Sequence, residues 1–270
     1  MPELPEVETT RLGLLPRLRG RTLQRIIVRN PRLRWPIPDD LGAQLTGRKL
    51  VGLARRGKYL LFDFGGVTQL VHLGMSGSLR FAETGEPAAL HDHVDWLFDD
   101  GTILRLRDPR RFGAVLWTDN VADHPLLAHL GPEPLTPPFD AAWLHALCQR
   151  RSAAIKQVIM DAQVVVGVGN IYASEALFHA GIRPATPALR LTRPACARLV
   201  AAIRQVLAAA IAAGGSSLRD YVHSSGEMGY FQLQTRVYGR EGLPCKTCAT
   251  PIRRMVQGQR ATFYCPRCQR

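Results

Sequence analysis

The N-terminus of the sequence carries a candidate amine nucleophile. Pro2 follows Met1, and the acids Glu3 and Glu6 come shortly after it. A small second residue such as proline permits removal of the initiator methionine, which would expose a secondary amine. An α-amino group has a pKa of roughly 8, far below that of lysine, so it can attack an electrophile near neutral pH.

The adduct of a secondary amine with an aldehyde would be an iminium ion that cannot lose a proton from its nitrogen. Its persistent positive charge would act as an electron sink for elimination at neighbouring carbons. Glu3 and Glu6 would supply a general acid and an electrostatic support. Proline followed by acids is also common at the start of a helix, so this pattern alone leaves a purely structural role open.

Four cysteines near the C-terminus form two Cys-x-x-Cys pairs with sixteen residues between them, Cys245 with Cys248 and Cys265 with Cys268. This spacing is typical of a tetrahedral four-cysteine zinc site, in which no position remains open for water and the metal is structural. Disulfides are the weaker alternative, because the sequence shows no export signal. We expect Cys148 and Cys196, which fall in helical stretches, to be ordinary buried thiols.

The hairpin between the two cysteine pairs carries Arg253, Arg254 and Arg260. A small hairpin has too little core to fold alone, so the metal would fix it. Arginines on such a ribbon suit contacts with phosphates, although a solvated charged face has the same composition.

The basic residues of the chain point to a polyanionic partner. The 270 residues have a formal net charge of +13 and a pI near 10.2, which favours nucleic acid. A basic ribosomal or surface protein without catalysis would have the same charge. Only four of the 35 basic residues are lysines, namely Lys49, Lys58, Lys156 and Lys246. Lysine can act as an acid or a base, whereas arginine cannot. A lysine in this arginine-rich chain can therefore mark a position that needs a titratable amine, or it can be present by chance without such a role.

Composition also excludes several classes. Apolar residues make up 46% of the chain, which is enough for a globular core. The most apolar segment, 201–213, contains Arg204 and Gln205, so we predict no membrane-spanning helix and no membrane partner. The acidic N-terminus differs from a secretory signal, and we expect a cytosolic protein.

The first half of the chain has the pattern of a leading helix followed by an antiparallel sheet. The residues from Pro2 to Leu18 predict the helix, which Gly20 would end. Short strand-like runs follow up to about Thr118, at 23–28, 58–64, 67–73, 94–98 and 103–106. Gly65-Gly66 and Asp99-Asp100-Gly101 are tight hairpin signals between two pairs of these runs. This half therefore predicts a β-sandwich or barrel.

Prolines at 132, 134, 137 and 138 mark a domain boundary. Beyond them the spacing of apolar residues is that of helices, over 140–150, 152–160, 171–180 and 193–213. A glycine-rich polar stretch, 216–229, follows. The final 35 residues hold eight basic residues and one acid. We predict an α+β protein with a β-sandwich domain at 1–131, a helical domain at 138–226 and a zinc-binding hairpin at 236–270.

Motifs spread over the whole chain resemble those of one family. They are Met1-Pro-Glu-Leu-Pro-Glu-Val-Glu-Thr9, Arg56-Gly-Lys-Tyr-Leu60, His72-Leu-Gly-Met-Ser-Gly77, Asp108-Pro-Arg-Arg-Phe-Gly113, Val166-Gly-Val-Gly-Asn-Ile-Tyr-Ala-Ser-Glu175, Gly229-Tyr-Phe-Gln232, Val237-Tyr-Gly239 and Gln259-Arg-Ala-Thr-Phe-Tyr264. Together with the four cysteines, they resemble formamidopyrimidine-DNA glycosylase, the bacterial repair enzyme for oxidised purines. Because the motifs occur in order over nearly the full length, the resemblance is far more specific than any one of them.

The resemblance implies a role for each matching position. Catalytic roles fall on Pro2 as nucleophile at C1′ of the lesion nucleotide, Glu3 as the acid that protonates the opening sugar, Lys58 in β-elimination and Arg260 in δ-elimination. Met75, Arg110 and Phe112 would fill the gap left by the extruded base, with Arg110 facing the orphan cytosine. DNA contacts would come from His91, Arg110, Arg151, Lys156, Asn170 and Arg260. A base inside a duplex is unreachable, so such an enzyme must flip it out and fill the hole, for which an apolar wedge is suited.

The resemblance further implies the architecture and the partners. The fold would be an N-terminal β-sandwich with a leading helix, a helix–two-turn–helix domain and a zinc ribbon, with one structural zinc ion and no organic cofactor. The enzyme would be a monomeric DNA glycosylase and abasic-site lyase of base excision repair. It would act on double-stranded DNA containing 8-oxoguanine, formamidopyrimidines or abasic sites, bound in a cleft between the two domains. We expect a cytoplasmic, nucleoid-associated enzyme with the 216–229 segment covering the lesion.

Two other hypotheses fit the same residues. An endonuclease VIII-type glycosylase for oxidised pyrimidines shares the proline mechanism, the turns and the ribbon, but the opening Glu3-Leu-Pro-Glu6 and the Arg110-Arg111-Phe112 wedge favour the purine enzyme. A binder of damaged DNA without catalysis would also keep the fold. Retention of Met1 would block the nucleophile and favour that second alternative.

Overall fold

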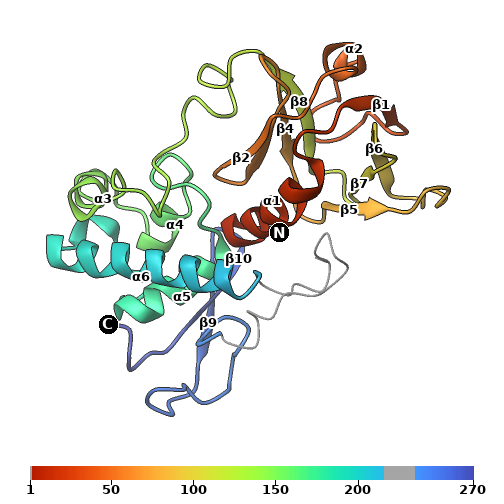
Figure 1. The fold of residues 1–270 in the computed structure, drawn as a ribbon. Helices are drawn as coiled ribbons and strands as arrows, with labels where there is room; N and C mark the ends of the chain where they lie inside the picture. The colour runs from red at the N-terminus through yellow and green to blue at the C-terminus, as the bar shows by residue number, and fades with distance from the viewer. Residues whose placement is uncertain (1, 216–234) are drawn as a thin grey trace. The chain divides into compact units, whose positions relative to one another are not determined.

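The computed structural model describes residues 2–215 and 235–270, which fall into two compact units. Unit 1 comprises Met1–Ala128 with Gly214–Tyr230, and unit 2 comprises His129–Ala213 with Phe231–Arg270. Figure 1 shows the strands β1 to β8 in the first unit and the helices α3 to α6 with a two-stranded ribbon in the second. The segment 216–229, expected to cover the lesion, lies outside the described residues.

Unit 1 begins with helix α1, Leu4–Leu18, which starts at the N-cap Glu3 with Pro5 in its first turn. Proline suits this turn because its missing N–H has no partner there anyway. Leu4, Leu14 and Leu18 are fully buried on one face, and the helix packs against strands β2 and β3. Gly20, with a φ of 84°, follows the end of the helix, as the sequence predicts.

Two antiparallel sheets form the sandwich of unit 1 (Figure 1). The first sheet has the order β1-β6-β7-β5 and consists of β1 Leu23–Val28, β5 Ser78–Ala82, β6 Asp92–Phe98 and β7 Ile103–Arg107. The second has the order β2-β3-β4-β8 and consists of β2 Gly52–Arg56, β3 Tyr59–Asp63, β4 Thr68–His72 and β8 Ala114–Thr118. A short helix, α2 Leu41–Leu45, packs near β1 and β8.

Both predicted hairpin turns are confirmed. β3 pairs with β4 across Gly65 and Gly66, which have φ values of 70° and 85°. β6 pairs with β7 across a turn that contains Gly101 at a φ of 82°. Glycine is the residue that adopts such backbone angles without a steric penalty. The core between the sheets is built from alternate strand residues such as Val94, Trp96 and Phe98 together with the buried face of α1.

Unit 2 is helical, with α3 Ala141–Cys148, α4 Ile155–Ile159, α5 Asn170–Ala180, the 3-10 turn η1 Ala188–Arg190 and α6 Arg193–Ala212. Helix α6 begins as the sequence predicts, because the side chain of Thr192 accepts a hydrogen bond from the backbone N–H of Ala195. It ends before Gly214 and Gly215, whose φ values of 77° and 83° stop the helix. Each of the four predicted helical segments contains a helix, but the helix in the 152–160 segment is only the five residues Ile155–Ile159.

By length and composition alone, α6 is long and apolar enough to cross a membrane, so the sequence-based exclusion of such a helix was too strict. Its contacts are those of a core helix. Eight of its 20 residues are buried, and it packs against α3 and α5. The guanidinium of Arg204 donates to the backbone oxygens of Pro134, Thr136 and Phe139. The apolar face of α6 therefore packs against other helices of unit 2, and its Arg204 has protein acceptors.

The C-terminal ribbon consists of β9, Arg253–Gln257, and β10, Arg260–Tyr264. The two strands are antiparallel, with Arg260 opposite Gln257 across the two-residue turn Gly258-Gln259. Both turn residues have positive φ, 53° and 62°, as a type I′ hairpin turn requires. A small core that includes Phe178 of α5 and Ile252 joins the ribbon to the helices of unit 2.

Candidate functional site

The predicted nucleophile and its neighbouring acids lie together at the start of α1. Pro2 is buried, and Glu3 and Glu6 are 2% and 0% exposed. The backbone N–H of Glu3 donates to Oε2 of Glu6 at 2.8 Å, which fixes the first turn of the helix. The helix start also places its positive dipole end beside the two carboxylates. The chain thus holds Pro2 next to a buried acid in a rigid element rather than on a loose terminus.

Lys58 lies in the two-residue loop that joins β2 to β3, after Gly57, which has a φ of 58°. Arg55 connects this loop to α1, because its Nε donates to Glu8 at 2.9 Å and its Nη1 donates to the carbonyl of Gly57 at 2.9 Å. Burial raises the pKa of Glu8, but hydrogen bonds from Arg11 and Arg55 outweigh it and lower the pKa below its usual value. Glu8 is therefore ionised at neutral pH and holds the Lys58 loop against the helix that carries Pro2.

His72, to which the sequence analysis assigned no role, lies on β4 opposite Tyr59. The two ring centroids are 4.8 Å apart. Burial lowers the pKa of His72 to about 4, with further contributions from the charges of Lys58 and Arg34. Its Nδ1 accepts the backbone N–H of Gly74 at 3.0 Å, so the neutral ring carries its proton on Nε2. His72 is thus an uncharged donor in the neighbourhood of Lys58, and only the fold reveals it.

The three predicted gap-filling residues lie on two turns of unit 1. Met75 belongs to the Met75 turn, residues 73–77 between β4 and β5, and Arg110 and Phe112 belong to the Arg110 turn, residues 108–113 between β7 and β8. Met75 and Phe112 are 38% and 41% exposed, which is unusual for large apolar side chains. The guanidinium carbon of Arg110 lies 4.8 Å from the centroid of the Phe112 ring. An apolar wedge and an arginine donor therefore occur side by side on the Arg110 turn.

A pocket of about 450 Å³ adjoins the Arg110 turn. It is lined by Arg32, Leu33, Arg34, Arg110, Arg111 and Phe112. The backbone N–H of Arg34 donates to the carbonyl of Gly113, which joins the two segments. Four arginines around one hollow are suited to bind phosphate groups or base edges.

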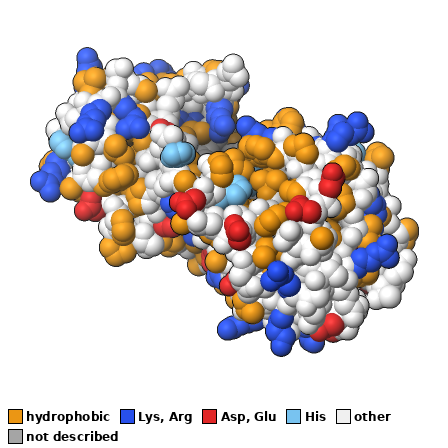
Figure 2. Space-filling view, turned by 90° about the horizontal axis from the view of Figure 1, so that it is seen from above, with side chains coloured by type: hydrophobic (Ala, Val, Ile, Leu, Met, Phe, Trp, Pro, Cys, Tyr) orange, Lys and Arg blue, Asp and Glu red, His pale blue; other side chains and the backbone are white. Residues whose placement is uncertain are grey.

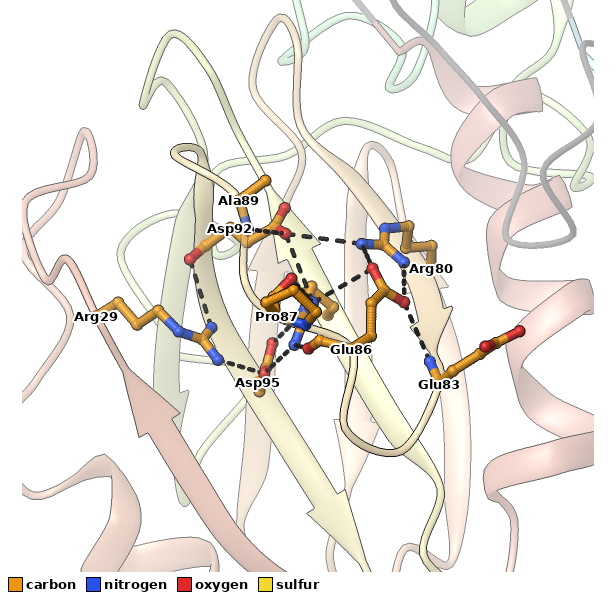
Figure 3. Close-up of polar contacts among 9 residues, drawn as sticks. Arg29, Arg80, Glu83, Glu86, Pro87, Ala89, Asp92 and Asp95 are labelled. Atoms are coloured by element: carbon orange, nitrogen blue, oxygen red, sulfur yellow. Dashed lines mark hydrogen bonds and ion pairs between the residues drawn. The ribbon is translucent and has the colours of Figure 1, made fainter.

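His91, a predicted DNA contact, precedes a buried ionic network that Figure 3 shows. Arg105 on β7 donates to both carboxylate oxygens of Asp95 on β6, each at 2.8 Å. Arg29 donates to the same carboxylate and also to the backbone oxygen of Asp92. Arg80 pairs with Glu86 and reaches Asp92. The network holds the 83–92 segment, which contains His91, against strands β5, β6 and β7.

In unit 2, Lys156 and Asn170 form one hydrogen-bonded cluster with β10. The Lys156 side chain is 1% exposed, and its Nζ donates to Oδ1 of Asn170 and to Oγ1 of Thr262, each at 2.6 Å. Asn170, the first residue of α5, donates from Nδ2 to the carbonyl of Ala261 at 3.0 Å. The sequence predicts a phosphate contact for Lys156. The structure adds that its ammonium joins the start of α5 to the ribbon.

Arg260 is exposed at the first position of β10, directly after the ribbon turn. A pocket of about 230 Å³ is lined by Lys156, Gln157, Met160, Gln257, Gly258 and Arg260. The remaining predicted contact, Arg151, is half-buried, and its Nη2 lies 3.7 Å from Oδ2 of Asp161. Unit 2 thus brings Lys156, Asn170 and Arg260 to one small region, with a helix N-terminus that favours anions.

The four predicted zinc ligands come together in unit 2. The sulfur atoms of Cys245, Cys248, Cys265 and Cys268 all lie within 4.8 Å of one another. The Sγ atoms of Cys248 and Cys265 are 3.4 Å apart, and those of Cys245 and Cys268 are 3.9 Å apart. A tetrahedral site with Zn–S bonds of about 2.3 Å needs sulfur separations of this order, so the four thiolates fit one zinc ion. All six cysteines are free of disulfide bonds, which removes that alternative.

Glu175 on α5 is a further residue to which the sequence assigned no role. Its side chain is buried, and its two carboxylate oxygens accept the backbone N–H groups of Arg236, Val237 and Tyr238 at 2.8, 3.0 and 2.8 Å. This carboxylate therefore anchors the chain where it enters the zinc ribbon. The sequence shows that Glu175 belongs to the 166–175 motif, but it does not show the hydrogen-bond partners, which lie 61 to 63 residues further along the chain.

These features define a class of protein. A buried proline beside two buried acids at a helix start, an exposed apolar wedge beside an arginine, and a basic cluster at a helix N-terminus next to four clustered cysteines are features of an enzyme that works on bases in DNA. Three family models match in chain order. The N-terminal domain of formamidopyrimidine-DNA glycosylase covers residues 1–115, the H2TH domain of that enzyme covers 130–222, and a zinc finger found in FPG and IleRS covers 242–270. The chain belongs to the formamidopyrimidine-DNA glycosylase family.

Similar proteins support this assignment over the full length. A formamidopyrimidine-DNA glycosylase of Thiobacillus denitrificans is 78% identical over 270 residues, with all of both chains covered. A solved structure of the Lactococcus lactis Fpg with DNA containing an abasic site has a TM-score of 0.92 and 34% identity, and 99% of each chain is covered. A solved structure of MutM with DNA containing carbocyclic 8-oxo-G has a TM-score of 0.91 and 35% identity, and 100% of each chain is covered. The predicted fold class is therefore confirmed.

Proposed function

We propose that the chain excises oxidised purines from DNA through a covalent intermediate on Pro2 and then cuts the strand by successive β- and δ-elimination. Membership of the family supports the glycosylase and abasic-site lyase activities of base excision repair. Its solved relatives are bound to DNA with an abasic site or with an 8-oxoguanine analogue, and this chain takes the same class of DNA partner. Because its partner is double-stranded DNA, the enzyme would work in the cytoplasm in association with the nucleoid.

The chemistry at the lesion begins with the N-terminal amine. The nitrogen of Pro2 attacks C1′ of the damaged nucleotide and the oxidised base leaves. Glu3 donates a proton to the ring oxygen of the sugar, which opens the ring and leaves an iminium ion between Pro2 and C1′. The rigid helix start and the adjacent Glu6 support these roles, because catalysis benefits from groups that are held in place before reaction.

Strand cleavage follows from the iminium ion. Its positive charge acidifies the hydrogens on C2′, so removal of one proton expels the 3′ phosphate. Lys58 transfers the proton in this β-elimination, and Arg260 assists the later δ-elimination that expels the 5′ phosphate. The product is a one-nucleotide gap with phosphate ends, and hydrolysis of the remaining iminium ion restores the Pro2 amine.

DNA recognition uses residues of both units. Met75 and Phe112 fill the space of the extruded base, and Arg110 donates to the orphan cytosine. His91, Arg151, Lys156 and Asn170 contact the DNA backbone. Lysine and arginine side chains are spread over the face seen in Figure 2, which suits attraction of the duplex. The four cysteines would hold one zinc ion, which would stabilise the ribbon that presents Arg260, and the proposal includes no organic cofactor.

The burial of Pro2 and Glu3 together at the start of α1 is the observation that carries this proposal. Borohydride reduction during reaction with a duplex containing 8-oxoguanine opposite cytosine tests it. We expect a covalent DNA adduct that maps to Pro2 by mass spectrometry, formed faster than with thymine glycol. The variant Glu3→Gln has the same shape without the acid, and we expect it to lose base excision.

Other results would lead to different conclusions. Preferential trapping on thymine glycol would identify an enzyme for oxidised pyrimidines. Intact DNA binding without any trapping would identify a non-catalytic binder of damaged DNA. Normal excision by the Glu3→Gln variant would remove Glu3 from the mechanism.

A further inference from the structure

We propose that Asp108 is a positioning residue that holds the Met75 turn and the Arg110 turn in register and so determines discrimination of the base opposite the lesion. This inference rests on the proposed function, in which Arg110 faces the orphan base. Asp108 itself is 0% exposed, so its side chain has no access to solvent. Its effect would pass through the two turns that it joins.

The Asp108 carboxylate connects the turns directly. Its Oδ1 accepts the hydroxyl of Ser76, from the Met75 turn, at 2.8 Å. Its Oδ2 accepts the backbone N–H of Gly113, at the end of the Arg110 turn, at 2.8 Å. The Ser76 hydroxyl in turn accepts the backbone N–H of Arg110 at 3.1 Å. One carboxylate and one hydroxyl thus fix the backbone next to all three gap-filling side chains.

The backbone of Asp108 extends the connection to the predicted DNA contact His91. Its N–H donates to the carbonyl of His91 at 3.0 Å, and its carbonyl accepts the N–H of Arg111 at 3.1 Å. The Nε2 of His93 lies 2.9 Å from the same carbonyl. The Met75 turn, the Arg110 turn and the chain at His91 therefore all bond to this single residue.

The two turns touch so closely that their relative placement has little freedom. A Cβ added at Gly74 would lie 2.4 Å from the carbonyl carbon of Phe112, and one added at Gly113 would lie 2.7 Å from the backbone oxygen of His72. Arg111 adopts a φ of 56°, which is uncommon for a residue with a side chain. Such a conformation persists only when surrounding contacts enforce it, and the bonds of Asp108 to Arg111 and Gly113 are among those contacts.

The chemistry of the carboxylate explains why the residue is an acid. In the part of the chain that the structure describes, Asp108 makes no ion pair, so its buried charge is compensated by hydroxyl and N–H donors alone. Burying a carboxylate is costly, and a neutral side chain would be cheaper if filling space were enough. A carboxylate has two acceptor oxygens and can hold two turns at once, whereas an amide has only one.

The variant Asp108→Asn tests the inference, because it keeps the shape and leaves one acceptor. Excision rates are measured on duplexes with 8-oxoguanine opposite cytosine and opposite adenine. Cleavage of a single-stranded abasic oligonucleotide is measured alongside, because that substrate has neither an orphan base nor a gap to fill. We expect the cytosine-over-adenine preference and the duplex-to-single-strand rate ratio each to fall by about five-fold, as loss of one hydrogen bond predicts.

Asp63→Asn is the matched control, because Asp63 also accepts a turn N–H, that of Gly65 at 2.9 Å, in a hairpin of the same unit. We expect it to leave both ratios unchanged. If Asp108→Asn lowers all three rates in parallel, or changes none, the residue does not position the turns and the inference is wrong. If the variant fails to fold, Ser76→Ala, which removes only the hydroxyl link to Arg110, must change the same two ratios.

The wild-type protein separates this inference from the proposed function. A wild-type enzyme without any preference for cytosine over adenine would contradict the reading of the orphan base by Arg110. A wild-type preference that persists unchanged in Asp108→Asn would contradict only the role of Asp108.

Discussion

Arg105 is the centre of the buried ionic network of unit 1, and its replacement by methionine gives a sharp prediction. Its side chain is 3% exposed, as is that of Asp95, and the side chain of Asp92 is 0% exposed. Arg105→Met keeps much of the volume but leaves these carboxylates with fewer partners. Asp95 retains Arg29 at 2.5 Å, and Asp92 retains Arg80 at 3.6 Å.

Removing one partner of a buried ion pair costs about 3–5 kcal/mol. Arg29 and Arg80 still compensate part of the negative charge that Arg105 no longer neutralises. We therefore expect a loss of unfolding free energy at the lower end of that range, about 3 kcal/mol. For a unit of this size the loss corresponds to a fall in Tm of about 10 °C. Tryptophan fluorescence during urea and thermal unfolding can measure it, because Trp35, Trp96 and Trp117 all belong to unit 1.

The pH dependence identifies the cause of the loss. In the wild-type protein, burial raises the pKa of Asp95, but hydrogen bonds from Arg105 and Arg29 lower it overall. Its stabilising contribution is therefore present above the unfolded pKa of about 4 and is lost as the pH falls through the lower folded value. Without Arg105, burial would raise the folded pKa above the unfolded one, and protonation would relieve the variant as the pH falls. The stability difference between the two proteins should thus be smaller at pH 4.5 than at pH 7.5.

Arg80→Met is the matched control, because Arg80 belongs to the same network but its side chain is 32% exposed. Water screens exposed pairs, so this variant should lose much less stability than Arg105→Met. Equal losses in the two variants, or a stability difference that does not change with pH, would refute the assignment of the effect to an uncompensated buried charge.

Two further predictions concern unit 2. Cys265→Ser should lose zinc, measured by metal analysis, and should lose DNA binding, measured by fluorescence anisotropy. The reason is that structural zinc contributes about 10–16 kcal/mol to the folding of zinc-finger peptides. Full DNA binding without metal would show that the ribbon is dispensable. Lys156→Met should weaken DNA binding and reduce the slope of log K against log salt by about 0.9, the contribution of one phosphate. An unchanged slope with weaker binding would mean that Lys156 acts only by holding Asn170 and Thr262.

The sequence predicted most elements because their signals are local. Gly65-Gly66 and Gly101 mark hairpins through backbone angles that glycine alone adopts readily, and Thr192 marks a helix start through a bond to a residue three positions away. The cysteine pairs predict their own cluster, since each knuckle is a short local motif. Such features depend on neighbours in the chain and are readable without the fold.

The supporting residues of the site could not be predicted in this way. Asp95 and Arg105 alternate with core residues on their strands, so each resembles a solvent-facing charge until the 83–92 segment covers it. Ser76 and Asp108 are 32 residues apart, and Lys156 and Thr262 are 106 apart. Each side chain alone has several plausible partners, and only tertiary packing selects one. The sequence could nominate residues for contact with DNA, but it could not identify the residues that position them.

The burial of acids also affects how the basic composition acts on DNA. Among the described residues, the buried charged side chains comprise six acids and two bases, namely Glu3, Glu6, Asp92, Asp95, Asp108, Glu175, Arg105 and Lys156. Glu6, Asp108 and Glu175 accept backbone N–H groups and serve as anchors. An acid used in this way stabilises a turn while it removes a negative charge from the surface. The exposed charge is consequently more basic than the net +13 of the whole chain, so the residues that fix the site also strengthen the attraction of the surface for phosphate.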